Sequence, residues 1–128
     1  MQPRLNPGEY VFCATNDLNV INRSNAIGRF QEQEGTTIII EKRQADELKL
    51  DYDYVAAWIT LEVHSSLNAV GLTASFSSAL AENNISCNVM AGFHHDHLFV
   101  DHRDRNKALE VLNKLSEKAK DAWINASD

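Results

Sequence analysis

The sequence has few of the residues that build disulfide frameworks or common catalytic motifs. It contains two cysteines, two prolines and five glycines. Cys13 and Cys87 lie in no C-x-x-C or other zinc spacing. Cys87 lies in an apolar segment, so we expect a buried, reduced thiol there. No G-x-S-x-G, H-E-x-x-H, Walker A or G-x-G-x-x-G motif occurs. We therefore expect no catalytic residue, no enzymatic activity and no cofactor.

The sequence also lacks an excess of positive charge and any long apolar run. Twelve basic residues against eighteen acidic ones give a net charge of −6. Nucleic acids and anionic membranes attract cationic surfaces, so we expect neither as a partner. No apolar run approaches the roughly 20 residues of a membrane span. The opening residues, MQPRLNPGEYVF, lack the apolar core of a signal peptide. The expected location is the cytoplasm.

The most regular pattern runs from Tyr54 to Val100. Alternating apolar positions predict a strand over 55–63, and apolar residues at helical spacing predict a helix that stops at Asn83. The segments ISCNVMA and HLFV predict two further strands. A long helix follows, capped by Asp101 or Asp104. This strand, helix, strand, strand, helix order is typical of the ferredoxin-like unit.

The N-terminal half predicts fewer elements. Strands are expected over 10–14 and 36–41, with an irregular lead-in before Tyr10 and a polar loop over 15–24. The helical turns after 41 are short. We therefore divide the chain into an N-terminal part, 1–50, that contributes two strands, and a βαββα domain, 51–128. A ferredoxin-like unit needs a strand after its second helix, and the two N-terminal strands could fill that place.

The predicted fold is α+β and ferredoxin-like, with an antiparallel sheet of about five strands and helices on one face. Strand alternation places an unusually apolar set on the opposite face. The set comprises Trp58, Thr60, Asn88, Met90 and Phe99. A face of this composition favours contact with a partner subunit or a second layer.

The strand-to-helix turn from His64 to Gly71, HSSLNAVG, is the strongest candidate site. The first N–H groups of a helix have no intrahelical partner, and the helix dipole favours an anion beside them. Ser65 and Ser66 add hydroxyl donors. The alternative is that these serines only cap the helix.

A second candidate is the run HHDH at the connection between two strands. Residues two apart on a strand share a face, so His95 and His97 could bind a metal together, with His94 and Asp96 nearby. A zinc site would need further ligands, for which His64, Asp101 and His102 are available. The alternative is a solvated hairpin tip whose histidines hydrogen-bond a ligand or a neighbouring loop.

The motifs VHSSLNAVGLTA and HHDHLFV, with the helix KALEVLNKL, resemble the second half of small stand-alone bacterial ACT-domain proteins. The segments PGEYVF and QEQEGTTIIIE resemble the first half of that two-part family. The similarity covers about residues 5–118. Related modules occur in aspartate kinases and in arginine sensors, where they bind amino acids as regulatory ligands. The chain departs from the family in lacking a leader helix and an Asp-x-Pro-Gly turn.

The resemblance implies ferredoxin-like modules that pair side by side and hold a small ligand, often an amino acid, at their interface. The implied partners are therefore an amino acid and a second copy of the chain. The family's ligand loop falls here on Ser65, Ser66, Leu67, Asn68, Val70 and Gly71, and Cys87, Asn88 and Val89 would approach from the paired module. The alternatives are a metal-binding protein that uses His94, His95, Asp96 and His97, and a module that regulates an enzyme by contact alone.

Overall fold

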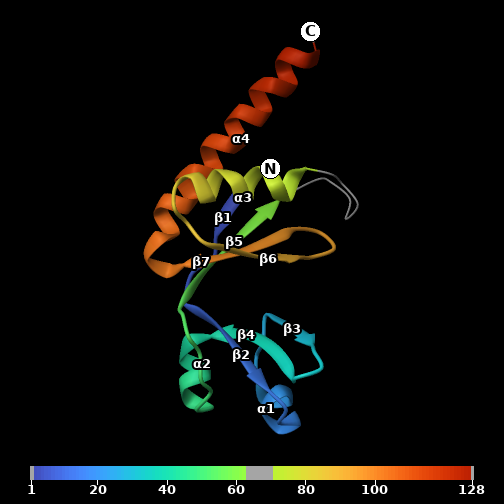
Figure 1. The fold of residues 1–128 in the computed structure, drawn as a ribbon, viewed down its shortest axis with the longest axis vertical. Coiled ribbons are helices and arrows are strands. Elements are labelled where there is room, and N and C mark those ends of the chain that lie inside the picture. The colour runs from blue at the N-terminus through green and yellow to red at the C-terminus, as the bar shows by residue number, and fades with distance from the viewer. Residues whose placement is uncertain (1, 63–70, 128) are drawn as a thin grey trace. The chain divides into compact units, whose positions relative to one another are not determined.

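The computed structural model describes residues 2–62 and 71–127. In these residues the chain forms seven strands, four α-helices and one 3₁₀ turn (Figure 1). The elements are β1 (Gln2–Leu5), β2 (Tyr10–Thr15), α1 (Leu18–Arg23), β3 (Gly28–Gln31), β4 (Thr36–Glu41), α2 (Lys42–Glu47), β5 (Ala56–Glu62), α3 (Leu72–Glu82), β6 (Cys87–Ala91), β7 (Asp96–Asp101), the 3₁₀ turn His102–Asp104 and α4 (Arg105–Ser127). None of the helices described is long and apolar enough to cross a membrane.

The chain divides into two compact units. The N-terminal unit is Pro7–Ala56, and the C-terminal unit combines Met1–Asn6 with Ala57–Asp128. The N-terminal unit contains β2, α1, β3, β4 and α2, and the C-terminal unit repeats this order with β5, α3, β6, β7 and α4. The predicted α+β, ferredoxin-like class is confirmed. The strands described number seven where the sequence predicted about five, because β1 and β3 were not anticipated as strands.

The C-terminal unit is completed by the first residues of the chain. Its strand order is β1–β5–β7–β6, and β1 pairs antiparallel with β5, with Leu5 opposite Ile59. The prediction of an irregular lead-in before Tyr10 is therefore wrong. The prediction that strands 10–14 and 36–41 would fill the missing place is wrong too, because β1 fills it. Pro3 is tolerated in β1 because this strand lies at the end of the order, where a lost N–H donor interrupts no ladder.

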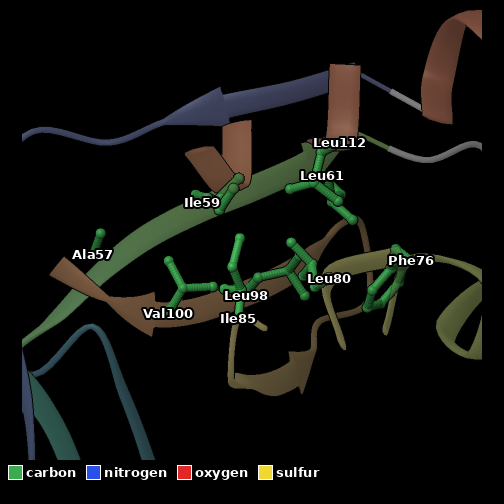
Figure 2. Close-up of a cluster of buried hydrophobic side chains, with 10 residues drawn as sticks. Ala57, Ile59, Leu61, Phe76, Leu80, Ile85, Leu98, Val100 and Leu112 are labelled. Carbon is green, nitrogen blue, oxygen red and sulfur yellow. The ribbon is translucent and has the colours of Figure 1, made fainter. Parts of the chain in front are cut away.

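The core of the C-terminal unit joins the strands to both of its helices (Figure 2). Phe76 and Leu80 from α3 pack with Leu98 from β7, and all three side chains are fully buried. Each such side chain contributes about 1.5–3 kcal/mol relative to an exposed one. The buried cluster comprises Ala57, Ile59, Leu61, Phe76, Leu80, Ile85, Leu98, Val100, Ala108 and Leu112. The helices therefore cover one face of these strands, as predicted.

The opposite face of the C-terminal unit carries the residues that strand alternation placed there. Asn88 pairs with Phe99 and Met90 with His97, out of phase with the core positions. The rings of Trp58 and Phe99 stack with centroids 6.5 Å apart. Phe99 and Thr60 are only 1% and 2% exposed, so this face is less open than the sequence suggested.

The N-terminal unit has a smaller core. Its strand order is β3–β4–β2, and Tyr10 at the start of β2 also pairs with Ala56. The buried cluster comprises Val11, Cys13, Ile38, Ile40 and Ala45. The prediction of a loop over 15–24 is wrong, because α1 forms there. The carboxylate of Asp17 accepts hydrogen bonds from the N–H groups of Asn19 and Val20 and thereby begins the helix.

Candidate functional site

Helix α3 begins at a residue that cannot cap it with a side chain. Gly71 holds the N-cap position with φ +94°, in the left-handed region that favours glycine. The first backbone bond of the helix runs from the N–H of Ser75 to the carbonyl of Gly71, at 3.0 Å. The N–H groups of residues 72–74 precede that bond and have no acceptor within the helix. Among the described residues, no heavy atom lies within 4 Å of a Cβ built at Gly71.

The remaining residues of the predicted turn, Ser65, Ser66, Leu67, Asn68 and Val70, lie outside the described residues, as does His64. The roles expected for them therefore stay predictions. The structure describes the two elements on either side of them, β5 and α3. Strand β5 runs to Glu62, and α3 is anchored to the core by Phe76 and Leu80.

Strand β6 presents its three predicted ligand residues on two different faces. Cys87 and Val89 pack against the core cluster, whereas Asn88 is exposed and pairs across the strands with Phe99. Burial raises the pKa of the Cys87 thiol to about 11. Cys87 is half-buried, whereas the sequence predicted a buried thiol. Because neighbouring side chains alternate, one ligand on one face cannot contact all three side chains, although it could contact the backbone of this strand.

The β6–β7 hairpin does not gather the histidine run into a metal site. Its tip is closed by a bond from the N–H of Gly92 to the carbonyl of His95, 2.9 Å long. Across the described ranges, 2–62 and 71–127, no group of three or more His, Cys, Asp or Glu side chains could hold a metal ion. The described residues therefore give no geometric support to the metal alternative built on His94, His95, Asp96 and His97.

His97 instead belongs to a hydrogen-bonded cluster that the sequence did not predict. Trp58 Nε1 donates to His97 Nδ1 at 3.1 Å, and Thr60 Oγ1 lies 3.5 Å from the same nitrogen. Asn6 Nδ2 donates to Thr60 Oγ1 at 2.9 Å. We call Asn6, Trp58, Thr60 and His97 the latch cluster. Strand alternation had predicted that Trp58 and Thr60 share one face. Asn6, however, lies in the segment that was predicted to be irregular, and His97 lies in the run that was considered as a metal site.

The environment of His97 disfavours its protonation. Burial is the largest cause that lowers the pKa of the ring, and His95 and Arg4 lower it further. Asp96 acts in the opposite direction. The neutral ring is also the form that the hydrogen bond requires, because an indole N–H can only donate and Nδ1 must accept.

A groove of about 360 Å³ lies between α3 and α4, away from Gly71. It is lined by Ala79, Glu82, Asn83, Lys107, Glu110, Val111, Lys114, Leu115 and Lys118. Lys107 donates to the carbonyl of Asn83, at the C-terminal end of α3. Lys114 forms an ion pair with Glu110 along α4. The groove therefore lies at the opposite end of α3 from the candidate ligand site.

Comparison with known proteins divides the chain into two matching parts. One family model, described as an ACT domain, matches residues 1–57, and a second ACT-domain model matches residues 54–114. No curated protein matches the chain.

Solved structures extend the likeness to almost the whole chain. A protein of unknown function from Vibrio cholerae is 42% identical, with 89% of this chain and 88% of that one covered and a TM-score of 0.82. A structure of aspartokinase α and β subunits is 12% identical, with coverages of 91% and 98% and a TM-score of 0.64. Aspartate kinase from Clostridium acetobutylicum, described as an allosteric enzyme, is 12% identical, with coverages of 88% and 33% and a TM-score of 0.63. At 12% identity the two kinases show likeness of fold alone.

Proposed function

Because this chain belongs to the ACT-domain family, we propose that it is a non-catalytic regulatory protein that binds an amino acid at the start of α3. ACT domains are regulatory and commonly bind amino acids. The observation that carries the proposal is Gly71, which begins an anchored helix and has no side chain of its own to cap the first N–H groups. A ligand carboxylate is the anion that such a helix start can accept.

Two further features support this site. Gly71 enters the helix with a left-handed φ, a backbone conformation that other residues rarely adopt. The space beside its α-carbon is free for at least 4 Å among the described atoms. We propose that residues 65–68 and 70 complete the site and that the backbone of β6 from a second copy borders it. The proposed assembly is a homodimer in the cytoplasm.

A thermal-shift screen of the twenty amino acids tests the function. Ligand at about 100 times its dissociation constant stabilises the folded state by about 2.7 kcal/mol. We expect at least one amino acid to raise the melting midpoint by several degrees. Zinc and nickel serve as additional wells, and a shift with metal alone would contradict the proposal.

A pair of variants then tests the position of the site. Gly71→Asp places a fixed carboxylate where the ligand carboxylate would bind, and we expect it to abolish the shift. Gly71→Asn is the matched control, because it has the same size, tolerates positive φ and carries no charge. We expect binding to Gly71→Asn to be weakened but measurable. Unchanged binding in Gly71→Asp would show that the amino acid binds elsewhere.

A further inference from the structure

The chain passes between its two units at Asn6–Pro7 and at Ala56–Ala57. Inside the C-terminal unit these two crossings are tied together. The N–H of Asn6 donates to the carbonyl of Trp58 at 2.9 Å, and Asn6 Nδ2 donates to the same oxygen at 3.2 Å. Asn6 follows β1, and Trp58 is the third residue of β5. The latch cluster therefore fixes the end of β1 to β5 where the chain leaves the C-terminal unit.

The ring of His97 contributes side-chain hydrogen bonds to this attachment of β1 to β5. It accepts from Trp58 Nε1 at 3.1 Å, and Trp58 is the residue whose carbonyl receives both bonds from Asn6. Thr60, which is 2% exposed, links Asn6 to His97. The hydroxyl of Thr60 can turn to accept from a protonated ring, but the indole of Trp58 cannot. Protonation of Nδ1 would therefore leave two N–H groups facing each other.

The β6–β7 hairpin lies close to one side of the ring. A Cβ added at Gly92 would lie 3.2 Å from His97 Nε2, so a larger residue at position 92 would crowd the ring. The charged groups around it are few. Arg4 on β1 pairs with Glu62 on β5, and the hairpin contributes His95 and Asp96. Met90, opposite His97 on β6, carries no charge.

We propose that His97 is a protonation-sensitive latch on the two chain crossings of the C-terminal unit. When the ring is neutral, Trp58 Nε1 keeps its hydrogen bond to His97 Nδ1, and the end of β1 stays attached to β5. When Nδ1 takes a proton from solvent, the Trp58 bond is lost and the attachment of Asn6 weakens. This device needs no ligand and does not rest on the proposed amino-acid site.

The pH range in which the latch responds follows from the direction in which the pKa of His97 is shifted. The pKa of His97 is lowered by folding, so the unfolded or opened chain binds the proton more readily. The stabilising effect of the neutral ring is therefore present above the ordinary pKa of about 6.5. It is lost as the pH falls from there through the lowered pKa of His97.

Hydrogen exchange measured by mass spectrometry from pH 8 to pH 5 tests the latch, after correction for intrinsic exchange rates. In the wild-type protein, exchange in residues 2–6 and 57–61 should accelerate by up to about tenfold per pH unit inside this window. In His97→Gln, whose amide oxygen can accept from Trp58 without titrating, exchange should not vary with pH. Trp58→Phe should raise exchange at every pH and flatten its pH dependence. The β4 peptide is the internal control and should not respond.

Two outcomes would overturn the latch. One is wild-type exchange that does not change across the window, and the other is the same pH dependence in His97→Gln. An NMR titration of His97 in the wild-type protein keeps the test valid if the variant folds poorly. A folded-state pKa at or above about 6.5 would contradict the proposal.

Discussion

The two units follow their first strands with helices that begin in opposite ways. In the N-terminal unit the carboxylate of Asp17 accepts from the N–H groups of Asn19 and Val20, so the helix start is already occupied by an anion of its own chain. In the C-terminal unit Gly71 holds the same position and offers no side chain. The same order of elements therefore has one helix that is capped by its own N-cap carboxylate and one whose N-cap residue has no side chain. This difference is the reason why we propose the ligand site in the C-terminal unit.

The two helices also differ in how firmly they are held. Helix α3 has eleven residues and buries Phe76 and Leu80, whereas α1 has six and buries Ile21. A binding site gains from a rigid support, because ordering a loose element costs conformational entropy on binding. The anchored helix is the one whose N-cap residue, Gly71, has no side chain.

The largest expected effect tests this anchoring. Leu80→Ala removes a fully buried side chain from α3 and should lower the free energy of unfolding by about 2–5 kcal/mol. Ile21→Ala in α1 is the matched change and should cost less, because Ile21 is 8% exposed and lies outside both buried clusters. Urea denaturation followed by circular dichroism measures both. If Ile21→Ala lowered the free energy of unfolding more than Leu80→Ala, α1 and not α3 would be the more firmly anchored helix.

A second test concerns the cysteine of β6. With a pKa of about 11 against an ordinary 9.0, Cys87 in the folded protein should hold about 100-fold less thiolate at pH 8 than a free cysteine. Its alkylation by iodoacetamide should slow in proportion. Cys13→Ser leaves Cys87 as the only thiol for this measurement, and urea-unfolded protein is the control. Alkylation of the folded protein at the rate of free cysteine would show that Cys87 faces solvent and not the core.

A smaller effect is expected at the self-capped helix. Asp17→Ala removes the carboxylate that accepts two N–H groups at the start of α1, which should cost about 0.5–2 kcal/mol. Asp17→Ser retains a capping oxygen without the charge and should recover most of the loss. Chemical denaturation of the three proteins gives the comparison. If Asp17→Ala also removed amino-acid binding, the assignment of the ligand to the C-terminal unit would fail.

The sequence predicted the elements whose patterns are long enough to read. Strand β5 and helix α4 show alternation or helical spacing over many residues, and β4 has three consecutive isoleucines. Strand β1 was missed because its partner lies more than fifty residues away and Pro3 interrupts any local strand signal. Helix α1 was missed because six residues with one buried side chain leave no periodicity, and Asn and Asp are typical of turns as well as caps.

The candidate site was less accessible to sequence reasoning than the fold. Gly71 was identified within the turn, but its role depends on a backbone angle that no residue pattern reports. The family resemblance placed both Cys87 and Asn88 near the ligand, and it did not distinguish the faces on which strand alternation places them. His97 was grouped with neighbouring histidines, whereas its contacts are with Trp58 and Thr60, which lie far from it in sequence. Contacts of this kind arise from strand register, which short motifs do not encode.

We propose that the start of α3, and not that of α1, receives the ligand. An NMR titration of ¹⁵N-labelled protein with the amino acid that stabilises it most tests this directly. We expect large shifts of the amide signals of Leu72, Thr73 and Ala74, with those of Asn19 and Val20 unchanged. Shifts at Asn19 and Val20, or none at residues 72–74, would contradict it.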